Sequence, residues 1–155
     1  MASKKGFTVD QIVEILRKEE ENETIEGQLL KPKLIRELYK QLGTPEEEDF
    51  KDIFKHGRYW KKYSGYTTDI SIMSKREMEN ENKMPTRWRI QRPSMTKVNI
   101  VEDYTRDGWS CEVQSYNVIC NKNVPHPKYK NIWVRFNSTR DCSRYEYIIL
   151  REENE

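Results

Sequence analysis

Two clusters along this chain combine basic with aromatic residues, a combination that suits contact with phosphates and bases. The first spans Lys51–Lys62, where five basic residues accompany one acid, Asp52. The second spans Lys83–Lys97, where five basic residues surround Trp88 and no acid occurs. Basic side chains neutralise phosphates, and aromatic or guanidinium planes stack on bases. The predicted nucleic-acid-binding residues are Lys55, Arg58, Trp60, Lys61, Lys62, Arg87, Arg89, Arg92 and Lys97.

Both clusters also have a structural explanation, which the sequence leaves open. Basic residues at the end of a helix interact favourably with its dipole, and their stems cover neighbouring apolar surface. Charges on an edge strand protect that strand from pairing with other chains. In an extended segment, Arg87 and Arg89 would project from one face and Trp88 from the other. If Trp88 packs inward, the two guanidinium groups are displayed together.

Residues suited to catalysis are few and widely separated. The two histidines are His56 and His126, and His126 lies between two prolines in a predicted loop, where a surface position is expected. The sequence contains no GxSxG elbow, no glycine-rich phosphate loop and no HExxH motif. We therefore predict a protein without catalytic residues and without a cofactor.

The three cysteines, Cys111, Cys120 and Cys142, are sparse and odd in number, so we expect reduced thiols. Together with His126 they could supply the ligands of a zinc site with three thiolates and one imidazole. No two of them have the separation of two to four residues that structural zinc sites usually show. Buried or surface thiols without a bound metal are the stronger expectation.

A helical N-terminal region is predicted to position the first cluster. Thr8 and Gln11 form a capping-box pattern at the start of a first helix, which an apolar stripe continues. Pro32 indicates the first turn of a second helix, and Gly43 indicates its end. The stripe of the first helix consists of Val9, Ile12, Val13 and Leu16.

A third helix is predicted to begin at the Thr44-Pro45-Glu46-Glu47 pattern and to end near Gly57. The three helices would form a compact, helix-turn-helix-like unit over residues 1–64. The third helix has an acidic first turn, whereas helix-turn-helix proteins usually present that turn to bases. We therefore expect this unit to contact phosphates rather than to read bases.

Strands around a mobile loop are predicted for the second half of the chain. Ser74–Thr86 has two methionines as its apolar side chains, apart from Pro85, and is predicted as a mobile polar loop. Asn131–Leu150 contains two alternating runs, which indicate a hairpin. Asn121–Lys130 is predicted as a loop because its two prolines exclude a central strand. The other predicted strands are Thr68–Met73, Arg87–Gln91, Lys97–Tyr104 and Trp109–Cys120.

Helices followed by strands indicate the α+β class. We predict an N-terminal three-helix unit followed by an antiparallel sheet of five to six strands. Residues 65–155 would form the β-rich part and pack on residues 1–64 as one compact domain. A chain of 155 residues is typical of a single domain.

Charge and hydropathy restrict the functional classes. The net charge is +2, from 28 basic and 26 acidic residues, so an electrostatic argument depends on local clusters. The N-terminus lacks a signal-peptide pattern, and no apolar run approaches the ~18 residues of a membrane span. We therefore expect a soluble, intracellular protein of the cytoplasm or nucleus without membrane contacts.

The main functional hypothesis is a non-catalytic nucleic-acid-binding accessory protein or subunit that contacts DNA or RNA phosphates through the two clusters. The alternative is a protein–protein adaptor, or a subunit of a larger assembly, without direct nucleic-acid contact. Four tryptophans and nine tyrosines fit an interface built on aromatic and arginine anchors. Steep salt dependence of nucleic-acid binding would separate the first hypothesis from the second.

Overall fold

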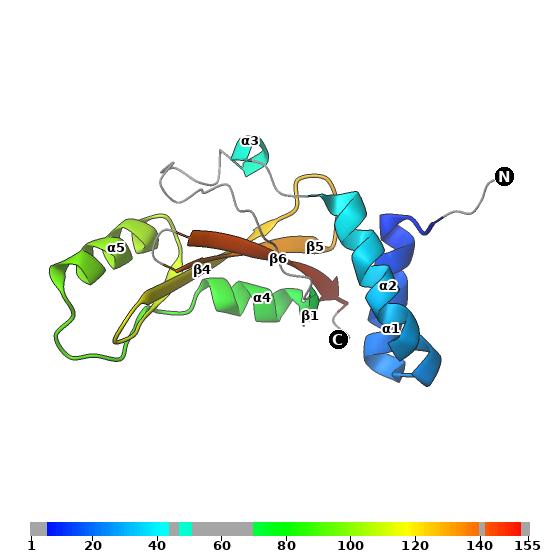
Figure 1. The fold of residues 1–155 in the computed structure, drawn as a ribbon, viewed down its shortest axis with the longest axis horizontal. Coiled ribbons are helices and arrows are strands. Elements are labelled where there is room, and N and C mark those ends of the chain that lie inside the picture. The colour runs from blue at the N-terminus through cyan, green and yellow to red at the C-terminus, as the bar shows by residue number, and fades with distance from the viewer. Residues whose placement is uncertain (1–5, 44–46, 51–69, 140–141, 153–155) are drawn as a thin grey trace.

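The computed structural model describes residues 6–43, 47–50, 70–139 and 142–152 of the chain. These residues form a six-stranded mixed sheet, curled into a half-barrel, with helices against both of its faces (Figure 1). The helices are α1 (Val9–Asn22), α2 (Ile25–Leu42), α3 (Glu47–Phe50), α4 (Lys75–Asn82) and α5 (Met95–Arg106). The strands are β1 (Ile70–Ser74), β2 (Arg87–Trp88), β3 (Ser110–Val113), β4 (Val118–Pro125), β5 (Ile132–Thr139) and β6 (Cys142–Arg151). Within these ranges, no helix is both long and apolar enough to cross a membrane.

The strand order β1-β6-β5-β4-β3-β2 places two short strands at the edges of the sheet. The four central strands pair antiparallel, whereas β1 pairs parallel with β6 and β2 pairs parallel with β3. The predicted antiparallel sheet is therefore wrong. At one edge the reason is α5, which connects β2 to β3 as a crossover helix and returns the chain so that the two strands run in the same direction.

The prediction for α1 is confirmed by its cap and by its buried side. Thr8 accepts a hydrogen bond from the Gln11 backbone N–H, and the Gln11 side chain accepts one from the Thr8 N–H. The four residues of the predicted stripe are all buried. α2 begins at Ile25, earlier than predicted, because Thr24 caps it and the helix accommodates Pro32 in its interior.

The predicted three-helix, helix-turn-helix-like unit is wrong, since α1 and α2 are two N-terminal helices without a third beside them in the described ranges. α3 is a single turn whose Phe50 packs edge-on against Phe136 of the sheet, with ring centroids 5.2 Å apart. α3 therefore covers the sheet instead of completing a helical bundle (Figure 1). The end of the predicted third helix and the boundary between residues 64 and 65 lie outside the described residues, and both stay predictions.

The segment predicted as a mobile loop, residues 74–86, contains α4. Ser74 and Glu77 form a capping box at its start, because each side chain accepts a hydrogen bond from the other residue's backbone N–H. Met78 is fully buried beneath the helix. A single buried side chain and one cap are a weak sequence signal in a segment that is otherwise polar, and this is why the helix was not predicted.

The segment Lys97–Tyr104, predicted as a strand, is part of α5. Ser94 caps the helix by accepting a hydrogen bond from the Lys97 N–H at 3.3 Å. Val101 and Tyr104 are three residues apart and form its buried side. β-branched residues favour a strand only in a suitable packing environment. Here packing against β3 and β4 selects the helix.

Other strand predictions are confirmed in part. The predicted closing hairpin exists as β5 and β6, and β1 covers most of the predicted strand Thr68–Met73. The loop predicted over Asn121–Lys130 is wrong for its first five residues, because β4 continues to Pro125. Pro125 is the last residue of β4, where its missing N–H disturbs the sheet least.

Alternating side chains of β5 divide the sheet into two faces. Ile132, Val134 and Phe136 are buried on the core face, together with the apolar sides of α1, α2 and α5. Trp133 and Arg135 alternate with these residues and point to the opposite face of the sheet. α4 crosses this face, which is called the α4 face below (Figure 1). The core face is therefore apolar, whereas the α4 face carries polar and charged residues at its centre.

Arg135 is the centre of an ionic network on the α4 face. Its guanidinium pairs with Glu81 of α4 at 2.6 Å and with Glu146 of β6 at 2.7 Å. Its Nε donates to Asn123 Oδ1 of β4 at 3.2 Å, and Asn123 Nδ2 donates to Glu81 at 2.9 Å. The side chain of Arg135 is 16% exposed. The network thus ties α4 to three strands in a largely desolvated position.

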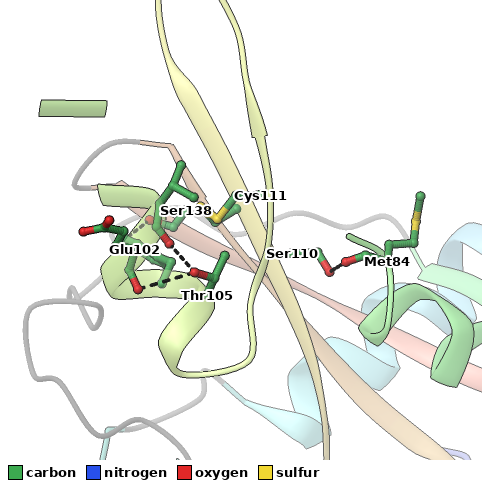
Figure 2. Close-up of a disulfide and its surroundings, with 9 residues drawn as sticks. Met84, Glu102, Thr105, Ser110, Cys111 and Ser138 are labelled. Atoms are coloured by element: carbon green, nitrogen blue, oxygen red, sulfur yellow. Dashed lines mark hydrogen bonds between the residues drawn. A yellow bond between two sulfur atoms is a disulfide. The ribbon is translucent and has the colours of Figure 1, made fainter. Parts of the chain in front are cut away.

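A disulfide joins Cys111 of β3 to Cys120 of β4 on the core face beside α5 (Figure 2). The two residues are direct partners in the β3–β4 register, and their Cα atoms are 4.0 Å apart. The expectation of three reduced thiols is therefore wrong for this pair. The pairing depends on the turn between the two strands, which the single predicted strand Trp109–Cys120 did not include.

Replacing Arg135 with methionine should lower the free energy of unfolding by about 3 kcal/mol, because Glu81 and Glu146 would lose their shared cation while remaining partly buried. Urea denaturation followed by circular dichroism measures this change. Arg106→Met is the matched control, since the Arg106 side chain is 62% exposed and pairs with Asp103 at 3.6 Å. Its loss should change the stability by less than about 0.5 kcal/mol. An equal decrease in the free energy of unfolding in both variants would contradict a central role for Arg135.

The double variant Cys111→Ala/Cys120→Ala should be less stable by about 2–3 kcal/mol, because the unfolded chain gains the freedom of the opened loop. Reduction should lower the melting temperature of the wild type and leave that of the double variant unchanged. Cys142→Ala serves as the control, and reduction should still lower its melting temperature. Titration of the unfolded, unreduced wild type with a thiol reagent checks the pairing, and reaction of all three cysteines would refute it.

Candidate nucleic-acid interface

An exposed edge of the sheet carries part of the second predicted cluster. β2 is the edge strand and pairs with β3 over two residues. Its shortness leaves the side chains of this segment in solvent: Arg87, Trp88, Arg89 and Arg92 are all exposed, and these four residues are called the β2 surface below. The first cluster, with Lys55, Arg58, Trp60, Lys61 and Lys62, lies outside the described residues and stays a prediction.

Two guanidinium groups of the β2 surface are free of acidic partners among the described residues. Glu112 is the register partner of Arg87, yet its carboxylate pairs with Arg89, whose Nε lies 2.5 Å from Oε2. Arg87 is therefore left without an ion pair in the described part of the chain, and the same holds for Arg92. The charges of Arg87 and Arg92 are available to an external anion, whereas that of Arg89 is partly compensated.

Lys97 is engaged within the protein. Its ammonium group donates to the backbone oxygens of Gln114 at 2.7 Å and Ser115 at 2.5 Å. These bonds attach the first turn of α5 to the turn between β3 and β4. The structure therefore does not bring Lys97 into the β2 surface, and its predicted phosphate contact would require these two bonds to break.

Apolar side chains are exposed at the same end of the molecule. Trp88 is 45% exposed, so the inward packing considered for it is incomplete. Met95 at the start of α5 is 68% exposed, and Tyr116 in the β3–β4 turn is 83% exposed. Sequence reasoning missed both, although the Ser-Tyr-Asn run at positions 115–117 is a turn signal that could have revealed Tyr116. α1 and α2 lie at the opposite end of the sheet (Figure 1).

A cavity of about 200 Å³ lies on the α4 face, with Arg87 in its lining. Met84 and Pro85, which follow α4, form one wall, and residues of β3 and β4 form the other. The Ser110 hydroxyl holds the two walls together, because it donates to the backbone oxygen of Met84 at 3.0 Å (Figure 2). It also donates to the backbone oxygen of Glu81 at 3.3 Å. The β2 surface therefore continues into a hollow lined by both polar and apolar residues.

His126 is half-buried, in contrast to the predicted surface position. Its Nδ1 accepts a hydrogen bond from the Lys128 N–H at 3.1 Å, and its ring lies 5.1 Å from that of Tyr129 and 5.8 Å from that of Tyr147. Burial, reinforced by the Lys128 charge, lowers the pKa of His126 from 6.5 to about 4, against a smaller opposing effect of Asp49. Burial also raises the pKa of Tyr147, whose hydroxyl donates to the Gly43 backbone oxygen. Both side chains are therefore neutral at physiological pH, and the Tyr147 hydroxyl joins β6 to the C-terminal end of α2.

Within the described ranges, no group of three or more histidine, cysteine, aspartate and glutamate side chains could hold a metal ion. The disulfide also occupies two of the thiols that the considered zinc site would need. Comparisons of the chain with protein-family models, with curated proteins and with solved structures found no match. The argument for a function therefore starts from the charges and rings of the β2 surface.

His126 should make stability depend on pH between about pH 4 and pH 6.5. Its pKa is lower in the folded than in the unfolded chain, so the unfolded chain binds the additional proton as the pH falls through this range. The free energy of unfolding should therefore decrease on acidification from pH 6.5 and be fully retained above it. His126→Gln keeps a hydrogen-bond acceptor but cannot titrate, and its stability should decline less over this range. Parallel stability curves for wild type and variant would contradict the expectation.

Proposed function

We propose that this protein is a non-catalytic nucleic-acid-binding accessory protein that contacts the phosphates of a single strand through the β2 surface. The observation that carries the proposal is the pair of exposed guanidinium groups, Arg87 and Arg92, which lack acidic partners in the described part of the chain. Trp88, 45% exposed, lies between them in the sequence. A single strand can offer phosphates to the arginines and a base to the indole ring at the same time.

The energetic contributions of these residues differ in kind. Each neutralised phosphate of a single strand releases counterions, so the logarithm of the binding constant falls with a slope of about −0.7 per contact against the logarithm of salt concentration. Stacking of one base on an aromatic ring contributes about 1–3 kcal/mol and tolerates any base. Phosphate contacts position the strand without reading its sequence. We therefore expect binding with strong salt dependence and modest sequence preference.

We place this function in the cytoplasm or nucleus, where nucleic acid is accessible. The disulfide between Cys111 and Cys120 argues against this placement, because disulfides are rare in both compartments. Peptide mapping of the protein from its own cells, after trapping of free thiols, decides the point. Two trapped thiols at these positions would agree with the placement, and an intact bond would favour an oxidising compartment.

A protein–protein adaptor is the second candidate function. It is favoured by Met95 and Tyr116, which are 68% and 83% exposed at the same end of the molecule. Aromatic residues, methionine and arginine are enriched in protein interfaces, whereas a phosphate backbone offers nothing to a methionine side chain. Under this alternative, Arg87 and Trp88 would act as anchors in pockets of a partner protein.

Fluorescence anisotropy with labelled single-stranded DNA, single-stranded RNA and duplex DNA tests the proposal over a range of salt concentrations. Arg87→Ala/Arg92→Ala should weaken single-strand binding and reduce the magnitude of the salt slope by about 1.4, the value for two phosphate contacts. Lys33→Ala/Lys40→Ala is the matched control, because it removes the same charge from exposed positions of α2. It should leave single-strand binding by the β2 surface unchanged.

Two results would overturn the proposal. The first is the absence of binding to all three probes at low salt by a folded protein. The second is an equal effect of the two double variants, because this would show that net charge alone, and not the β2 surface, governs binding. Either result would favour the adaptor, and the same β2 variants would then be used against candidate protein partners.

A further inference from the structure

The cavity beside Arg87 continues the β2 surface onto the α4 face of the sheet. We infer that it binds one unstacked guanine base of the strand whose phosphates the β2 surface contacts. This inference rests on the proposed function, and it goes further by adding a base preference that phosphate contacts do not supply. It is carried by the cavity's volume, by the apolar residues in its lining and by the two polar side chains that remain available there.

The size and walls of the cavity suit a flat aromatic ring. Its volume is about 200 Å³, and it lies between Met84 and Pro85 on one side and Ile119 of β4 on the other. Bases of single strands are recognised when they are splayed out of the stack and enclosed by such apolar or aromatic surfaces. Ser110 keeps the Met84 backbone attached to β3, so this wall is present before any ligand arrives.

Most other polar groups at the cavity are already engaged. The Glu81 carboxylate pairs with Arg135 and accepts from Asn123, and the Ser110 hydroxyl donates to two backbone oxygens. The Asn121 side-chain amide, in contrast, has no hydrogen-bond partner among the described residues. Of the Glu112 carboxylate, Oε2 bonds to Arg89 and Gln114, and Oε1 has no partner in the described part of the chain.

Glu112 and Asn121 are placed to bond to the two ends of a guanine edge. Glu112 pairs with Ile119 in the β3–β4 register, and Asn121 lies two residues further along β4, so the two side chains are diagonal neighbours on the same face. A carboxylate oxygen accepts hydrogen bonds only, and the free Oε1 of Glu112 can accept from the adjacent N1–H and N2–H donors of guanine through its two lone pairs. The asparagine amide can donate to the guanine O6 acceptor. Adenine offers no such pair of adjacent donors.

Arg87 connects the base to the backbone of the same strand. It lines the cavity and has a free charge, so a nucleotide whose base enters the cavity would place its phosphate within reach of this guanidinium. Arg89 has a different role in this arrangement, because its ion pair with Glu112 orients the carboxylate. The second cluster therefore supplies one arginine to the phosphate and one to the group that recognises the base.

Anisotropy with labelled oligothymidines of about eight nucleotides tests the inference. One central thymidine is replaced by guanosine, by inosine, which lacks the 2-amino group, or by adenosine. The guanosine probe should bind about tenfold more tightly than the adenosine probe, with the inosine probe in between, since a matched set of hydrogen bonds to one base edge discriminates by roughly this factor. This comparison uses the wild-type protein, so it does not depend on the folding of any variant.

Two variants locate the preference in the cavity. Asn121→Leu and Glu112→Gln should bind all probes with similar affinity while retaining salt-dependent binding to oligothymidine. Asn137→Leu is the matched control, because Asn137 is the register partner of Asn121 on the same face of β5 but does not line the cavity. It should keep the guanosine preference.

Equal binding of the guanosine and adenosine probes by the wild type would overturn the inference, and so would a preference that Asn121→Leu and Glu112→Gln both retain. If binding in either case remains salt-dependent and is weakened by Arg87→Ala/Arg92→Ala, the proposed function stands without the base site. Absence of binding to every probe would overturn both the base site and the proposed function.

Discussion

The ionic network around Arg135 is the constraint on which the architecture of the α4 face depends. α4 is a short, very polar helix with one fully buried side chain, Met78, so apolar burial alone holds it weakly. Arg135 attaches it to β5 and β6 through two carboxylates, and Asn123 completes the hydrogen bonding from β4. Taking three charges partly out of water is unfavourable unless each has a partner. The network satisfies this condition and thereby fixes where α4 crosses the sheet.

The position of α4 in turn determines which residues lie at the β2 edge of the sheet and line the cavity beside it. The chain leaves α4 through Met84 and Pro85, which form a wall of the cavity, and then enters β2. β2 pairs with β3 over two residues, and α5 connects the two strands. On the core face, the disulfide and the 2.7 Å hydrogen bond between Tyr104 and Ser138 hold β3 and α5 against the centre of the sheet. The strand β3, with which the very short edge strand pairs, is thus held in place on both faces of the sheet.

Arginines of the same chemistry acquire different roles because their surroundings differ. Arg135 is 16% exposed, and its charge is used inside the protein. Arg89 is 62% exposed, but Glu112 competes with any external anion for it. Arg87 and Arg92 have neither a buried position nor an acidic partner in the described ranges, so an anion meets no internal competitor there. Exposure and local ion pairing therefore decide which arginines can bind an external anion. The number of basic residues in a segment does not decide this.

Local sequence signals by themselves determined the features that a few neighbouring residues specify. The cap at Thr8, the buried stripe of α1 and the alternation of β5 are short-range patterns, and they were predicted because helix and strand periods are visible in any short window. Composition located the second cluster, but it left open whether the arginines of that cluster are exposed. Tertiary structure alone decided the rest: α5 in place of a strand, α4 in place of a loop, the parallel edge strands, the Cys111–Cys120 pair and the cavity. The edge pairing, the disulfide and the cavity depend on the register and packing of segments that are distant in sequence, and the local caps of α4 and α5 are too weak a signal to reveal these helices without that packing.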